Sequence, residues 1–330
     1  MGSKIQNINH TNTANDSKLR LDFIGDVHGY ANALENILRK MGYIQTNKGW
    51  AHPTNIAVFV GDFINRGPHN RKTIEIIRTM VENNHAYAIL GNHEINAICY
   101  FTKRKSGKPL RMPGPANRKQ LDKIKREYIT QPTVFEDTIK WLRHLPLYIN
   151  FGSVRVVHAY WNDAHISLLY KEVPAKKLTK SFLKEAMQGG TEISKAFIQT
   201  TRGVEFCFPP NLIVRDNSHF RRINFRVKWW NSPYDKTYEE ISMETKYHLP
   251  NIPVHEEIIV PFEVYKPTDP PVFIGHYSMN GHNPIQSPNV CCVDAGVAAK
   301  GRLAAYRWSG EQVLDINKMI FADSFSDEDD

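Results

Sequence analysis

The sequence of 330 residues has little cysteine and no long apolar run. Its four cysteines, Cys99, Cys207, Cys291 and Cys292, show no Cys-x-x-Cys spacing, so we expect reduced thiols in a cytoplasmic protein. No apolar run approaches the ~18 residues that a membrane span needs. Residues 1–18 are polar and have no apolar segment of the secretory type. These absences predict a protein without a membrane partner.

The chain has an ordinary globular composition with a basic balance. Hydrophobic residues make up 41% and charged residues 23%, and the formal net charge is +8 despite an acidic C-terminus. A basic body favours an anionic, phosphorylated substrate. The alternative is a lysine-rich surface that is merely solvated.

Three short polar strings are the most informative part of the sequence. They are residues 25–29 (Gly-Asp-Val-His-Gly), 61–67 (Gly-Asp-Phe-Ile-Asn-Arg-Gly) and 91–94 (Gly-Asn-His-Glu). Each follows an apolar run, at 21–24, 56–60 and 86–90, and precedes a helical pattern, which predicts strand, loop and helix three times over.

Parallel strands with helical crossovers place their carboxyl ends on one sheet edge, so the three loops are expected to meet in one cleft. The cleft would gather Asp26, His28, Asp62, Asn92 and His93. Carboxylate, imidazole and amide donors suit Mn²⁺, Fe or Zn²⁺, and a carboxylate can bridge two cations. Asp62, on the middle loop, is the candidate bridge.

The three strings, spaced by 36 residues from Asp26 to Asp62 and by 30 from Asp62 to Asn92, resemble the calcineurin-like metallophosphoesterases. The resemblance covers about half the chain. Within that superfamily it is to the branch of phosphoprotein Ser/Thr phosphatases and bacterial symmetrical diadenosine-tetraphosphate hydrolases. It implies an α/β fold of four layers, an αββα sandwich of two mixed β-sheets flanked by helices, with insertions.

The resemblance also implies a ligand set for two divalent cations. Two further histidines follow apparent strands, His158 after 154–157 and His276 after 272–274. One cation would be held by Asp26, His28 and Asp62, and the other by Asp62, Asn92, His158 and His276. Mn²⁺ is the first expectation, with Fe, Zn, Ni and Mg as alternatives. Without the resemblance, His158 would be read as a hydrogen-bonded core residue.

Catalytic and phosphate-binding roles follow from the same motif positions. His93 is the candidate general acid, Arg66 the candidate phosphate clamp, and Asn92, His93 and Arg202 further phosphate contacts. The match at Arg202 is short, and a helix that ends at Arg202-Gly203 explains it equally well. The Ser/Thr phosphatases carry an aspartate where this sequence has Asn65, which can accept a hydrogen bond but adds no charge, so His93 is expected to be a weaker base.

The remaining segments divide the chain into a tail at 1–18, a domain at 19–320 with insertions near 101–130 and 164–270, and an acidic tail at 321–330. Residues 103–126 hold ten lysines or arginines against one acid, Asp122, so nucleic acid is a possible but unfavoured partner. Residues 206–230 predict a hairpin with a basic face. Residues 290–295 and 302–308 are expected to pair and to close the second sheet.

Together these features predict a dinuclear-metal phosphoesterase in which a hydroxide shared by two cations attacks phosphorus in line. The favoured substrate is nucleotide-like, such as a diadenosine polyphosphate. Phosphoprotein Ser/Thr and RNA-end phosphatase activity are alternatives within this class. A nucleic-acid-binding module and an inactive scaffold are alternatives of other classes.

Overall fold

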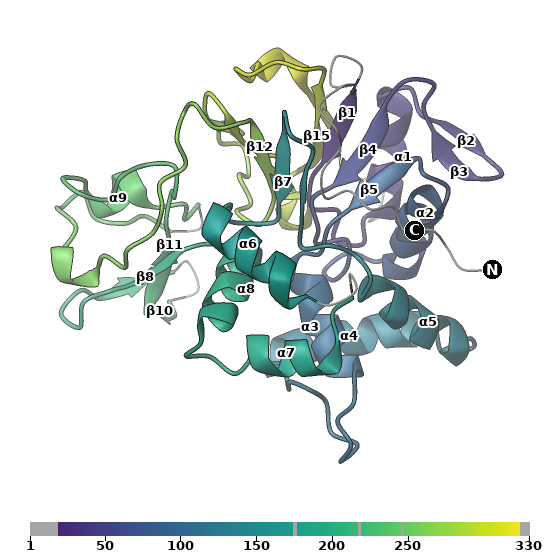
Figure 1. Cartoon of the computed structure of the whole chain (residues 1–330), viewed down its shortest axis with the longest axis horizontal. Helices are drawn as coiled ribbons and strands as arrows, with labels where there is room; N and C mark the ends of the chain where they lie inside the picture. Colours follow the sequence, from purple (N-terminus) through teal and green to yellow (C-terminus); the bar gives the residue numbers. More distant parts are fainter. Residues whose placement is uncertain (1–18, 174–176, 217–218, 246, 324–330) are drawn as a thin grey trace.

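Two five-stranded mixed β-sheets form the centre of the molecule (Figure 1). The structure is a computed structural model that describes residues 19–173, 177–216, 219–245 and 247–323. The expected tail at 1–18 lies outside the described residues. The expected acidic tail starts later than predicted, because residues 321–323 pair with β15 as the end of strand β16; its remainder, 324–330, is not described.

The first sheet has the strand order β16-β15-β1-β4-β5. Its strands are β1 (Leu21–Ile24), β4 (Ile56–Phe59), β5 (Ala86–Ala88), β15 (Arg302–Trp308) and β16 (Met319–Asp323). β1, β4 and β5 are parallel, and β15 and β16 run antiparallel along one edge. The helices that follow the parallel strands are α1 (Ala31–Lys40), α2 (Asn70–Glu82) and α3 (Asn92–Phe101). The three predicted strand-loop-helix units are therefore confirmed.

The second sheet has the order β13-β14-β12-β7-β6. Its strands are β6 (Tyr148–Asn150), β7 (Arg155–Val157), β12 (Val272–Ile274), β13 (Ile285–Ser287) and β14 (Val290–Cys292). β7, β12 and β14 are parallel. The pairing expected between 290–295 and 302–308 is wrong. β14 pairs with β12 and β13 in this sheet, whereas β15 pairs with β1 and β16 in the other, because Tyr306 and Trp308 enter the core between the sheets.

Apolar residues between the two sheets hold the sandwich together. The rings of Phe23 on β1 and Phe273 on β12 stack with centroids 3.8 Å apart, inside a cluster of buried side chains from both sheets. The alternate face of β1, with Ile24, packs with α1, α2 and α3 in a second cluster. The period-two alternation thus assigns each side of a strand to a different layer. The predicted two-sheet α/β sandwich is confirmed.

The outer face of the second sheet packs mainly against residues 205–265, which we call the cap segment. Figure 1 shows this segment in green beside β7 and β12. It contains β8 (Glu205–Cys207), β9 (Val214–Arg215), β10 (Arg221–Arg222), β11 (Asn224–Arg226), α9 (Tyr238–Ile241) and a 3-10 turn, Glu256–Ile258. The predicted β character of 206–230 is confirmed, as two short ladders, β8 with β11 and β9 with β10.

The remaining elements of the described ranges are helices, a hairpin and 3-10 turns. They are α4 (Pro115–Glu127), α5 (Pro132–Leu142), α6 (Asp163–Glu172), α7 (Lys180–Ala186), α8 (Glu192–Arg202), the β2–β3 hairpin (Ile44–Thr46 and Gly49–Ala51), and 3-10 turns at Val297–Ala299 and Ile316–Lys318. The loop between α3 and α4 projects at the bottom of Figure 1. Within the described ranges, every helix is too short or too polar to cross a bilayer.

Candidate metal centre and adjoining pocket

Five strand ends deliver polar side chains to one place. Asp26 follows β1, Asp62 follows β4, Asn92 begins α3 after β5, and His158 and His276 follow β7 and β12. These strands belong to both sheets, so the centre lies where the carboxyl ends of the two sheets meet. The structure therefore brings together residues that the sequence separates by 250 positions.

The two carboxylate oxygens of Asp62 face two different groups of histidines. Asp62 Oδ2 lies 4.0 Å from His28 Nε2 and 3.8 Å from His93 Nε2. Asp62 Oδ1 lies 3.4 Å from His158 Nε2. Two clusters with metal-ligand spacing result, His28, Asp62 and His93 on one side and Asp62, His158 and His276 on the other. Asp62 is the member that they share.

Backbone carbonyls fix the orientation of two of these imidazoles. His158 Nδ1 donates to Val60 O at 2.8 Å, and His28 Nδ1 donates to Ile64 O at 3.1 Å. The proton of each neutral ring then sits on Nδ1, and Nε2 presents a lone pair toward Asp62. Metal-ligating histidines usually donate in this way from the ring nitrogen that does not face the metal, and this hydrogen bond fixes the orientation of the ring.

The contacts of Asn92 are a test of whether a cation fits. Its Oδ1 lies 3.2 Å from His158 Nε2 and 2.8 Å from His276 Nδ1. In the neutral ring His158 Nε2 carries a lone pair, so two acceptor atoms face each other at the first of these contacts. Although burial opposes it, the Asp62 carboxylate raises the pKa of His158, which shows that positive charge is favoured at this place. A divalent cation between such atoms satisfies both.

Asp26 gives a second test. Its side chain is buried, and Oδ1 has no hydrogen-bond partner among the described residues, although Oδ2 accepts from His276 N at 3.1 Å. Burial, with the neighbouring carboxylates of Asp294 and Asp62, raises the pKa of Asp26 well above its ordinary value. By contrast, although burial opposes ionisation, the imidazoles of His158 and His93 lower the pKa of Asp62. Buried carboxylates this close together need positive charge, which divalent cations supply. The residues present fit two divalent cations.

The backbone around the centre is tightly constrained. A Cβ on Gly91 would stand 2.1 Å from Asp62 Oδ1, and one on Gly275 would stand 2.1 Å from Asp26 Oδ1. His28, Asp62 and His276 themselves have positive φ, between 49° and 69°. A positive φ is uncommon for residues other than glycine, although Asp and His adopt it more often than most, and such conformations concentrate where side chains must be aimed at a site.

Glu94 holds two of the loops together, a role that the sequence analysis missed. Its Oε2 accepts from Asp62 N at 2.8 Å and Gly91 N at 2.9 Å, and its Oε1 accepts from Phe63 N at 2.8 Å. Burial and the nearby Asp62 raise the pKa of Glu94 to about 7. The available signal was its place in the Gly-Asn-His-Glu string, three residues after the helix-capping Gly91.

Asn65 contacts His93 in a different way from the one expected. Asn65 Nδ2 lies 2.7 Å from His93 Nδ1, so the amide donates rather than accepts, and Asn65 Oδ1 has no partner among the described residues. Donation to Nδ1 favours the neutral ring with its proton on Nε2. Burial is the largest cause that lowers the pKa of His93, to about 4, and the cation of Arg66 adds to it although Asp62 opposes it. This direction agrees with the expected weaker base.

Arg66 lies at the exposed rim, next to Asn65, and both residues have a φ of 73°. Its amide N donates to Gln120 Oε1 of α4 at 3.0 Å. Lys123, one turn further along α4, donates from Nζ to Gly67 O at 3.1 Å. The second half of the basic stretch 103–126 is therefore a helix that supports the Arg66 loop, which was not foreseen from the sequence.

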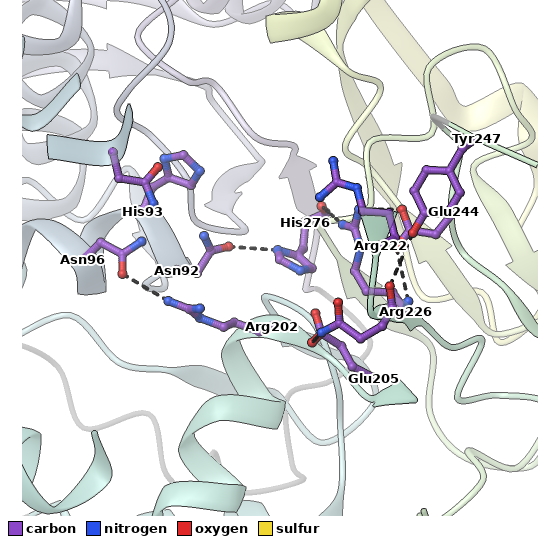
Figure 2. Close-up of a pocket in the computed structure, with 12 residues that line it drawn as sticks. Asn92, His93, Asn96, Arg202, Glu205, Arg222, Arg226, Glu244, Tyr247 and His276 are labelled. Carbon is purple, nitrogen blue, oxygen red and sulfur yellow. Dashed lines mark hydrogen bonds and ion pairs between the residues drawn. The ribbon is translucent and has the colours of Figure 1, made fainter. Parts of the chain in front are cut away.

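A pocket of about 310 Å³ opens beside the centre. Figure 2 shows it running from Asn92, His93 and His276 to side chains of the cap segment. Its twelve lining residues are Asn92, His93, Asn96, Asn117, Arg202, Glu205, Arg222, Asn224, Arg226, Glu244, Tyr247 and His276. Arg202 is indeed the last residue of α8, before Gly203, but its side chain also enters the pocket and donates to Asn96 Oδ1 at 3.1 Å. Of the predicted basic face, Arg222 and Arg226 line the pocket.

The fold and the centre agree with comparisons to known proteins. Residues 19–230 match the calcineurin-like phosphoesterase family, and the chain belongs to that family of hydrolases. The family uses divalent metals, in keeping with the donor clusters around Asp62.

Two curated relatives and one solved structure illustrate the likeness. The chain is 32% identical to the asymmetrical bis(5'-nucleosyl)-tetraphosphatase PrpE of Oceanobacillus iheyensis, over 43% of this chain and 56% of that protein's length. It is 25% identical to the symmetrical bis(5'-nucleosyl)-tetraphosphatase of a Janthinobacterium species, over 89% of this chain and 94% of that protein's length. A cold-active protein-tyrosine phosphatase of a Shewanella species shares the fold, with a TM-score of 0.51 and 17% identity. The match covers 92% of this chain and 80% of that one.

Proposed function

We propose that this protein hydrolyses a phosphoanhydride bond of a nucleotide-type substrate such as a dinucleoside polyphosphate, using two divalent cations, with Mn²⁺ the first expectation. The observation that carries the proposal is the division of the Asp62 oxygens between two donor clusters. The curated relatives described above are named as tetraphosphatases that act on such nucleotides, which supports the substrate class.

The roles of the side chains follow from their positions. Asp26, His28 and Asp62 would hold one cation, since Asp26 Oδ2 lies 4.0 Å from His28 Nε2, and His93 of the first cluster would stay free for proton transfer. Asp62, Asn92, His158 and His276 would hold the other cation. When bound, the pair supplies Lewis acidity and a water of lowered pKa at the phosphorus. Arg66 and Arg202 would bind phosphoryl oxygens through their guanidinium forks, because this planar donor matches two oxygens at once.

His93 favours an anhydride over a phosphoprotein ester. A serine or threonine alkoxide is a poor leaving group and needs a proton from a strong general acid. Burial and the Asn65 amide keep His93 neutral near pH 7, so it rarely carries a proton that it could donate. The leaving group of a phosphoanhydride is itself a phosphate and needs little protonation, so this histidine is sufficient for that reaction.

The experiment is a substrate panel with the full chain loaded with Mn²⁺. Diadenosine tetraphosphate, a phosphoserine peptide and a 5'-phosphorylated RNA represent the three candidate classes. We expect the highest kcat/KM on the dinucleotide, and loss of activity in Asp62→Asn. Preference for the peptide or the RNA would contradict the substrate class, and equal rates in Asp62→Asn would remove Asp62 from the reaction.

A further inference from the structure

The end of the pocket farthest from His93 is built from the cap segment alone. It comprises Glu205, Arg222, Asn224, Arg226, Glu244 and Tyr247, and we call it the cap-side end. Resting on the proposed function, we infer that this end binds the nucleoside of the substrate while the phosphates lie at the metal side.

The shape of the pocket sets the direction of the ligand. His93 stands at one end of the row in Figure 2, Asn92 and His276 follow toward the middle, and Glu244 and Tyr247 stand at the other end. Arg226 adjoins the metal side, because its Nη1 donates to His276 O at 3.1 Å. A phosphoryl group at the metal centre therefore directs whatever is attached to it toward the cap segment. The volume of about 310 Å³ is at the lower end of the range for small-molecule sites.

Charges at the cap-side end are already compensated. Arg226 Nε lies 3.1 Å from Glu244 Oε1, and Arg226 Nη2 lies 3.2 Å from Glu244 Oε2, with both side chains largely buried. Arg222 Nη2 is paired with the buried carboxylate of Asp216. A second phosphate would gain little from these guanidinium groups and would lie close to carboxylates.

Arg202 shows the contrast with the metal side. Its guanidinium donates to the neutral amide of Asn96, and although the carboxylates of Glu205 and Asp62 act on it, the neighbouring charge that acts most strongly is the cation of Arg111, so positive charge remains for an anion. The pocket thus offers less compensated positive charge near His93 than near Tyr247. This asymmetry suits a ligand with an anionic end and an uncharged end.

The groups at the cap-side end are those that recognise a nucleoside. The Arg222 guanidinium lies over the buried Tyr247 ring, 5.9 Å from its centroid, and its other, exposed side offers a flat surface. Asn224 Nδ2 donates to Glu205, and Arg226 donates to Glu244. Each carboxylate keeps further lone pairs that can accept from an amine or hydroxyl group of a ligand. A base supplies a flat ring with amine and carbonyl edges, and ribose supplies hydroxyls.

The test uses two substitutions that change the charge in opposite senses, Arg222→Gln and Glu244→Gln. Arg221→Gln is the matched control, because Arg221 is the exposed neighbour on β10 and does not line the pocket. Kinetics of the Mn²⁺-loaded full chain are compared on diadenosine tetraphosphate, inorganic tripolyphosphate and p-nitrophenyl phosphate. Binding of adenosine, measured by calorimetry, gives a readout that needs no turnover.

For a nucleoside site, both substitutions lower kcat/KM on the dinucleotide about tenfold relative to p-nitrophenyl phosphate, mainly through KM, because each removes a charged hydrogen-bonding group. Adenosine binding weakens in the same two variants, and Arg221→Gln behaves like the parent. If the cap-side end binds a phosphate instead, the two variants change tripolyphosphate hydrolysis in opposite directions. The rate then falls in Arg222→Gln and rises in Glu244→Gln, and this result would overturn the inference. Unchanged dinucleotide kinetics and adenosine binding in both variants would also overturn it.

Failure of the proposed function looks different. In that case the parent protein hydrolyses none of the three substrates. Adenosine binding to the parent and its loss in Arg222→Gln then still decide the inference. We expect this variant to fold, because the side chain of Arg222 is 46% exposed and glutamine keeps a hydrogen-bond donor for Asp216.

Discussion

The amide nitrogen of Asn65 donates to Nδ1 of His93 across 2.7 Å. The contact joins the loop after β4 to the start of α3, and it sets the proton of the neutral imidazole on Nε2. An aspartate at position 65 would reverse the direction of the hydrogen bond and would favour the imidazolium.

We predict that Asn65→Asp makes His93 a stronger participant in leaving-group protonation. Hydrolysis of phenyl phosphate, which has a poor leaving group, should rise relative to p-nitrophenyl phosphate by about tenfold, at the low end of typical general-acid effects. The measurement is the ratio of the two kcat values. Asn84→Asp, on the exposed turn after α2, is the control and should leave the ratio unchanged. An unchanged ratio in Asn65→Asp would remove His93 from proton transfer.

Glu94 should be needed for metal binding although it is not placed as a ligand. Glu94→Gln keeps the volume but turns the donor NH2 of an amide toward the backbone N–H of Asp62 or Phe63. Each group left without a partner costs about 1–3 kcal/mol. We expect the affinity for Mn²⁺ to fall about 10- to 100-fold, as for other changes behind a ligand. Metal titration followed by calorimetry measures it.

Glu82→Gln, on the exposed end of α2, is the matched control for Glu94. It should bind Mn²⁺ like the parent. Normal affinity in Glu94→Gln would mean that the loops keep their arrangement without the carboxylate.

Gln120 should act through Arg66. Gln120→Ala removes the acceptor for Arg66 N, so the loop loses one hydrogen bond of about 0.5–1.5 kcal/mol. We expect KM for p-nitrophenyl phosphate to rise several-fold with a smaller change in kcat. Lys119→Ala, at the exposed preceding position, should change neither constant. A pure loss of stability with normal KM would contradict the positioning role.

Away from the site, Asp22 should contribute to stability alone. It is fully buried on β1 and accepts from Arg307 Nε at 2.9 Å, Tyr43 Oη at 3.0 Å and Asn55 Nδ2 at 3.0 Å. Asp22→Ala leaves these donors without their acceptor and should lower the free energy of unfolding by about 3 kcal/mol. Urea denaturation measures the loss, and kcat of the folded variant should match the parent.

Much of the centre was predictable because its signals are local. Asp26, Asp62 and Asn92 each follow an apolar strand, and the rule that parallel strands end on one edge brings them together. The pairing of β15 with β1 was not predictable in this way. An antiparallel partner from the far end of the chain is chosen by which apolar face fits the core, here Tyr306 and Trp308.

The cap-side end of the pocket was equally hard to foresee. Arg222 and Arg226 were identified as basic positions, but their partners Asp216 and Glu244 lie on separate turns of the cap segment. Only tertiary contacts show that these charges are balanced. The direction of the Asn65 amide also depends on packing, because an amide can donate or accept with almost the same shape.

The central claim is that Asp62 is shared by two cations. Its most direct test is the metal content of the Mn²⁺-loaded protein by elemental analysis after removal of free metal, for the parent, Asp62→Asn and the exposed control Asp137→Asn. We predict two ions per chain in the parent and in Asp137→Asn, and one or none in Asp62→Asn. One ion in the parent, or two in Asp62→Asn, would contradict the claim.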